Sequence, residues 1–111
     1  MGTDEALVKR VRAETAGTPG LSEMKAFGGL SFLVYGNLAC GVIGVELIVR
    51  VKPEETQQTL SQPHTRVFDM TGRPMKGWIV VTPSGLGTQE ELRRWVQQGV
   101  NYAASLPAKK P

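Results

Sequence analysis

The sequence predicts an α+β domain in which an antiparallel sheet of about five strands packs against helices from the two ends of the chain. Between Met24 and Val51 the chain is typical of β-strands, and the connections there are too short for a parallel crossover. Both ends of the chain instead place apolar residues at helical spacing. The expected order is α-β-β-β-α-β-β-α in a single domain of 111 residues, with a core of about 5–107 and a frayed tail at 108–111.

The first helix is predicted over Thr3–Thr15, with Thr3 as its N-cap. The glycines and proline of 17–20 end it. Three strands follow as a meander, over 30–35, Leu38–Ile43 and Glu46–Val51, with a two-residue turn at Gly36-Asn37 between the first two.

A short helix, two strands and a long helix are predicted for the second half of the chain, over 53–61, 66–70, 78–82 and 88–106. Thr88 and Glu91 match a capping box at the start of the last helix. The strand Trp78–Thr82 has few polar side chains, so it is expected inside the sheet and beneath that helix. Trp95 and Tyr102 are candidates for a partner-binding face, but their place on an apolar stripe favours the core.

Charge and cysteine content limit the classes of function. A net charge of +3 is too small to predict more than weak or indirect binding to nucleic acid. With one cysteine, Cys40, and one histidine, His64, neither a metal site nor a Cys–His catalytic pair is supported, and no cofactor is expected. Without a signal peptide, and with polar residues interrupting Leu30–Val51, the chain is expected in the cytoplasm and not in a membrane.

Two segments concentrate the candidate site residues. Gly28 and Gly29 are read as a structural bend or bulge in preference to a phosphate-binding loop, because the strand-to-helix context is missing. The loop 69–77 either presents cations to an anionic partner or is held in shape by Gly72 and Pro74, with the structural reading favoured. The candidate binding surface consists of Arg50, Arg66, Asp69, Arg73 and Lys76.

Several contiguous motifs are distinctive in combination: Phe27-Gly-Gly-Leu-Ser-Phe32, Leu47-Ile-Val-Arg-Val51, Pro63-His64, Thr71-Gly-Arg-Pro-Met-Lys-Gly-Trp78 and Ser105-Leu-Pro107. Together they resemble the N-terminal domain of the TfoX/Sxy competence-regulator family. The resemblance implies an α+β fold and a link to transcriptional control of natural competence, where full-length members act with a cyclic-AMP-responsive activator. Those members carry a second, helical C-terminal domain, and this chain is expected to be a standalone form without it. The family supplies no established catalytic residues.

Three functions remain open from the sequence. The leading hypothesis is a non-enzymatic protein-interaction module with a link to transcription. A sensor of small anions or nucleotides requires Arg50, Arg66, Arg73 and Lys76 to share one concave site. Direct binding of nucleic acid requires those residues, with Arg93, Arg94 and Lys9, to form one stripe. A homodimer is expected through a sheet edge or through an outward apolar face containing Leu33 and Ile48.

Overall fold

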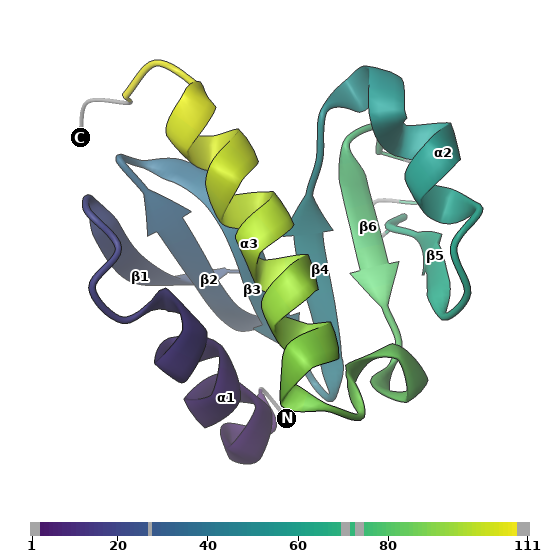
Figure 1. Ribbon diagram of the computed structural model, residues 1–111, viewed down its shortest axis with the longest axis horizontal. Coiled ribbons are helices and arrows are strands. Elements are labelled where there is room, and N and C mark those ends of the chain that lie inside the picture. Colours follow the sequence, from purple (N-terminus) through teal and green to yellow (C-terminus); the bar gives the residue numbers. More distant parts are fainter. Residues whose placement is uncertain (1–2, 27, 70–71, 73–74, 109–111) are drawn as a thin grey trace.

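The computed structural model describes residues 3–26, 28–69, 72 and 75–108. Its elements are α1 (Glu5–Thr15), β1 (Leu21–Ala26), β2 (Gly29–Val34), β3 (Asn37–Ile43), β4 (Glu46–Arg50), η1 (Pro53–Glu55), α2 (Thr56–Leu60), β5 (Thr65–Val67), β6 (Trp78–Val81), η2 (Pro83–Leu86) and α3 (Gln89–Ser105). Within these residues the strands form one antiparallel sheet in the order β1-β2-β3-β4-β6-β5. The helices α1 and α3 lie on one face of it (Figure 1). This is the α+β class that the sequence predicts.

The sheet has six strands where about five were predicted, and the additional one is β1. It pairs with β2 and forms an outer edge of the sheet, so the element order is α-β-β-β-β-α-β-β-α. The four residues 22–25 are all exposed, so this strand has no buried face along them. The alternation of apolar and polar residues that identifies a half-buried strand is therefore missing from the sequence. Only the pairing with β2 reveals this strand.

The first hairpin turn lies one residue earlier than predicted. Val34 pairs with Asn37, so the two turn residues are Tyr35 and Gly36 rather than Gly36 and Asn37. Both have positive φ, of 50° and 83°, as a tight hairpin turn that matches the twist of its strands requires. Asn37 is instead buried, and its side-chain Nδ2 donates a hydrogen bond to the Pro107 carbonyl at 2.9 Å.

The sequence predicts the N-terminal cap of α3 correctly but not that of α1. Asp4, and not Thr3, caps α1, because its carboxylate accepts the Ala6 N–H at 2.9 Å. Thr3 instead forms an isolated parallel bridge with Gly44. At α3 the predicted capping box is present, since the Thr88 side chain accepts the Glu91 N–H and the Glu91 carboxylate accepts the Thr88 N–H.

The main core lies between the sheet and its helices. Its largest fully buried side chains are Val11, Phe32, Leu47, Ile79 and Leu92. Trp95 is 9% exposed and belongs to this core. This confirms the core position that its place on an apolar stripe predicted. A Cβ at Gly99 would lie 2.1 Å from the Ala39 carbonyl oxygen, so the glycine lets α3 lie directly on β3.

The strand β6 lies inside the sheet, between β4 and β5, as predicted. The long helix does not lie mainly above it, however. The helix α3 packs over β3 and β4, and the short helix α2 lies against β6 (Figure 1). The residues of β6 that face the helices, Ile79 and Val81, still reach the main core.

Candidate functional site

The loop between β5 and β6 covers part of the sheet face that the helices leave open. The Phe68 ring stacks on the Trp78 ring with a centroid separation of 5.2 Å. Backbone hydrogen bonds from Met75 N–H to the Phe68 carbonyl and from Trp78 N–H to the Met75 carbonyl close the base of the loop. We call the resulting cluster the smaller core, and its members are Ile48, Phe68 and Val80 with Ile43, Met75 and Trp78 packed against them.

The smaller core corrects the expectation of an outward apolar face. Ile48 is only 4% exposed, because the loop covers it within the same chain. Leu33, nearer the other edge of the sheet, is half-buried. An apolar surface containing Ile48 is therefore not available for self-association. The exposed large apolar side chains of the described residues are instead Met24, Tyr35 and Val45.

Arg50 is held between aromatic rings and does not project freely from the surface. Its guanidinium carbon lies 4.9 Å from the centre of the Trp78 ring and 5.6 Å from that of Tyr102. Its Nε is buried and has no hydrogen-bond partner among the described residues. Cation–π contacts of this kind stabilise a partly desolvated guanidinium. Arg50 thus joins β6 to α3 at the end of β4.

The remaining candidates of the binding surface that the structure describes differ in their surroundings. Arg66 forms an ion pair with Glu46 across the sheet. Asp69 is exposed, and its carbonyl accepts the Gly72 N–H at 2.8 Å in a turn where Gly72 has φ of +84°. Lys76 is exposed. Arg73 and Pro74 lie outside the described residues. Other residues line the clefts beside α1 and α3.

The two glycines at the start of β2 have backbone roles. Gly28 has φ of +75° in the turn between β1 and β2, a conformation that glycine adopts at low cost. A Cβ at Gly29 would lie 2.1 Å from the carbonyl oxygen of Val42. A side chain at that position would therefore push β2 away from the neighbouring strand. These features agree with a structural bend at 28–29.

Cys40 and His64 lie apart and in different environments. Cys40 is fully buried, and burial raises the pKa of its thiol to about 12. His64 is exposed, with a positive φ of 66°, and its backbone carbonyl accepts the Thr82 N–H. Within the part of the chain that the structure describes, no group of three His, Cys, Asp or Glu residues is placed to hold a metal ion.

A polar network between α1 and the start of α3 was not anticipated from the sequence. Arg10 Nη2 donates to the carbonyl oxygens of Leu86 and Thr88 at 2.7 and 3.1 Å. The Gln89 side chain donates to Glu14 at 2.7 Å, and this bond, with a second from Arg93, lowers the pKa of Glu14. Arg10 and Glu14 are four residues apart and therefore share one face of the helix. This spacing is the sequence signal from which the network could have been predicted.

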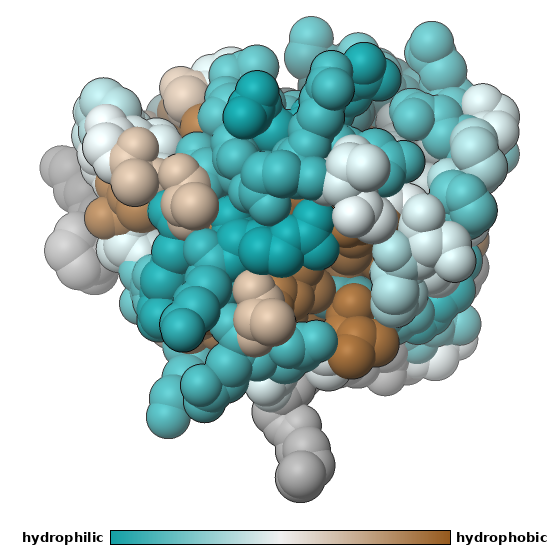
Figure 2. Space-filling model, turned by 60° about the horizontal axis from the view of Figure 1, so that its bottom comes forward, coloured by the Kyte–Doolittle hydropathy of each residue, from teal (hydrophilic) through white to brown (hydrophobic). Residues whose placement is uncertain are grey.

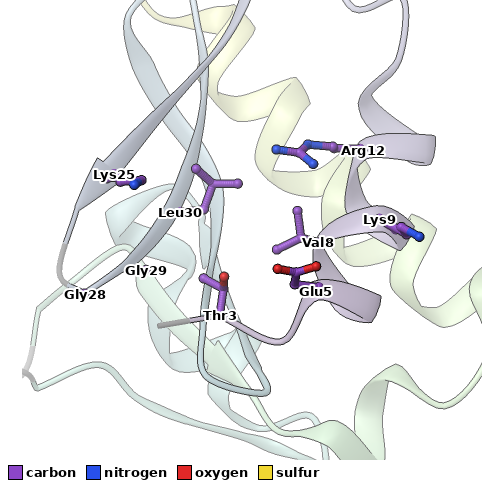
Figure 3. Close-up of a pocket in the computed structure, with 9 residues that line it drawn as sticks. All are labelled: Thr3, Glu5, Val8, Lys9, Arg12, Lys25, Gly28, Gly29 and Leu30. Carbon is purple, nitrogen blue, oxygen red and sulfur yellow. The ribbon is translucent and has the colours of Figure 1, made fainter. Parts of the chain in front are cut away.

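A cleft of about 690 Å³ lies between α1 and the β1–β2 hairpin (Figure 3). Val8 and Leu30 line its middle, and Arg12 and Glu5 extend over it from the helix. Lys9 points away from the strands in this view, and Lys25 lies out on β1, so the two lysines stand at opposite rims. The Arg12 guanidinium also binds both carboxylate oxygens of Glu23 on β1, at 3.0 and 2.9 Å.

The surface that Figure 2 presents is mostly hydrophilic, and its apolar residues form patches separated by polar ones. Four exposed or half-exposed arginines are paired with carboxylates of the same chain, in the pairs Arg12–Glu23, Arg66–Glu46, Arg93–Glu14 and Arg94–Glu90. The four arginines lie on α1, β5 and α3. No continuous stripe of unpaired arginines therefore results from these four residues. Among the described residues, moreover, no helix has the length and apolar character needed to cross a membrane.

Comparison with known proteins identifies the fold family. The model of the TfoX N-terminal domain family matches residues 14–103. This range begins in the last turn of α1 and ends within α3. No curated protein and no solved structure matches the chain significantly. The matched range contains the entire sheet, the loop of the smaller core and most of α3. The chain thus belongs to the TfoX N-terminal domain family.

Proposed function

We propose that the chain is a competence-type regulatory module that acts in the cytoplasm through contact with another protein. In this proposal it catalyses no reaction and does not recognise DNA directly. Family membership supports the regulatory part of the proposal. The mode of action is inferred from the distribution of charge over the fold.

The observation that carries this proposal is the internal pairing of the arginines. Arg66 is paired with Glu46, and Arg50 lies against two aromatic rings. Arg93 and Arg94, which a DNA-binding stripe would require, are paired with Glu14 and Glu90. Non-specific DNA binding depends on several cations that contact successive phosphates. Among the described residues, charges that are paired in this way do not form a continuous stripe of free cations, and they do not form a convergent anion site.

The regulatory role is tested by deleting the gene in its native host and comparing transcripts with and without a plasmid copy. We expect a defined set of transcripts to change and to recover with the wild-type copy. A tagged copy should retrieve a specific protein in parallel. Unchanged transcripts in the deletion strain would refute the regulatory role, whatever the tagged copy retrieves.

Two binding measurements separate protein contact from the other functions. Fluorescence anisotropy with a random DNA duplex at physiological salt should give a dissociation constant no tighter than about 10⁻⁵ M. Submicromolar binding there would replace the proposal with direct DNA contact. In thermal-shift measurements, nucleotides and inorganic phosphate should leave the melting temperature unchanged, and a saturable rise would favour an anion sensor.

A further inference from the structure

The strand β1 is an open edge of the sheet. It pairs with β2 on one side, and the side chains of 22–25 are exposed. The opposite edge, β5, is shorter, because it contains only Thr65–Val67. No other strand of the described residues pairs with the outer side of this six-residue strand, so its outward backbone donors and acceptors can bind another strand.

The hydrogen bonding to β2 determines which groups of β1 point outward. The Tyr35 N–H donates to the Gly20 carbonyl at 2.9 Å, and Ala26 faces Gly29 at the other end of the hairpin. In an antiparallel ladder, residues alternate between bonding to the neighbour and pointing away from it. The even-numbered residues of β1 therefore bond to β2. Glu23 and Lys25 direct their backbone N–H and carbonyl groups to the open edge, whereas the Leu21 N–H donates to the Thr18 carbonyl at 3.3 Å.

The side chains of β1 are complementary to a second, antiparallel copy of the same strand. We propose that two copies of the chain form a symmetric dimer in which β1 pairs with β1, with Glu23 of each copy opposite Lys25 of the other. Both residues have outward backbone groups, so each such pair exchanges two backbone hydrogen bonds. Opposite charges on directly facing residues add to the stability of a strand pair.

Charge selects this register over its neighbours. In antiparallel pairing of two β1 strands, residues with outward backbone groups must face residues of the other copy that also have outward groups. The allowed registers therefore differ by steps of two residues. One step in one direction places Glu23 opposite its own copy, and one step in the other places Lys25 opposite its own copy. Like charges that face each other directly are unfavourable. Of these three registers, only the intermediate one places Glu23 of each copy opposite Lys25 of the other.

The two faces of β1 also suit this arrangement. Met24 faces the side of the sheet opposite the helices and is 52% exposed, and the two-fold axis would bring the two Met24 side chains together. On the helix side, the bidentate contact with Arg12 holds the Glu23 carboxylate in place on a strand that is otherwise exposed. The acceptor is thus ordered before the second copy arrives, which lowers the entropic cost of pairing. This dimer is independent of the proposed regulatory function.

Complementary charge reversal tests the dimer and its register. Multi-angle light scattering across the micromolar range should report a dimer for the wild-type chain. Lys25→Glu and Glu23→Lys should each weaken the dimer at least tenfold, because like charges then face each other. Mixed in equal amounts, the two variants should form a heterodimer, because opposite charges face each other again. Lys76→Glu, which changes the same charge at an exposed lysine outside β1, is the matched control and should remain dimeric.

Circular dichroism and thermal melting establish that each variant is folded, which matters most for Glu23→Lys because it also removes the contact with Arg12. A wild-type chain that is monomeric throughout the micromolar range would overturn the proposal, as would folded variants that do not associate when mixed. Dimers of unchanged strength in both single variants would likewise exclude β1 as the interface.

Disulfide trapping tests the register without altering charge. Met24→Cys should form a covalent dimer rapidly on mild oxidation, since facing residues of a non-hydrogen-bonded pair lie within the range of a disulfide. Ser22→Cys, exposed on the same strand face, should remain largely uncross-linked, because in this register Ser22 is not opposite its own copy. Cys40 is buried and does not interfere. Equal cross-linking of the two variants, or faster cross-linking of Ser22→Cys, would refute the register.

Discussion

The ring of Phe68 stacks on the ring of Trp78 at a centroid distance of 5.2 Å, with 19° between the ring planes. This contact joins the two ends of the loop between β5 and β6, and it covers Ile48 on the sheet face opposite the helices. The base of the loop is therefore part of the fold. Asp69, Gly72 and Lys76 are the exposed residues among those of the loop that the structure describes.

Replacement of Phe68 by alanine should destabilise the chain by about 3 kcal/mol. Phe68 is 3% exposed, so truncation removes buried apolar area and leaves a cavity between Ile48 and Trp78. Urea denaturation measures the change in the free energy of unfolding. Val45→Ala is the control, since Val45 is 53% exposed and its loss should have little effect. Equal stability of the two variants would show that the smaller core does not form.

Trp95→Ala should lower the free energy of unfolding by about 3–5 kcal/mol, because α3 directs the indole of Trp95 into the main core. The neighbouring Arg94→Ala serves as a control, since its side chain is 79% exposed and its ion pair with Glu90 lies at the surface. Thermal melting followed by circular dichroism compares them. A Trp95→Ala variant that melts with the wild-type chain would contradict the packing of α3.

The network around Glu14 should make stability depend on pH in the acid range. Hydrogen bonds from Gln89 and Arg93 hold the pKa of Glu14 below its ordinary value of 4.5. A carboxylate whose pKa is lowered by folding stabilises the fold above its unfolded pKa, and this contribution is lost as the pH falls through its folded pKa. The stability difference between the wild-type chain and Glu14→Gln should therefore shrink below about pH 4.5. Urea titrations at several pH values measure it, and a constant difference would refute the assignment.

Cys40 should not react with thiol reagents while the chain is folded. Burial excludes the reagent and raises the pKa of the thiol to about 12, so the thiolate is scarce at neutral pH. Ellman's reagent should modify the thiol at the rate of unfolding, and immediately in denaturant. Fast modification of the native chain would show that β3 is open to solvent.

The sequence by itself determined the class of the fold, the meander of β2, β3 and β4, the interior position of β6 and the capping box of α3. Each of these depends on local chemistry. Alternating apolar residues, short connections and the pair Thr88 and Glu91 act over a few residues and are readable in order along the chain. The family resemblance was readable for the same reason, because it depends on short contiguous motifs, most of which lie within the matched range 14–103.

Tertiary structure alone decided how residues far apart in the sequence meet. The edge strand β1 has exposed side chains and becomes a strand only by pairing with β2. Arg66 forms an ion pair with Glu46, twenty residues away, so a cation of the candidate binding surface already has a partner in the fold. Ile48 is buried by Phe68 from a distant loop. The physical reason is that burial and charge pairing depend on which surfaces the folded chain brings together, and no local pattern of residues records that.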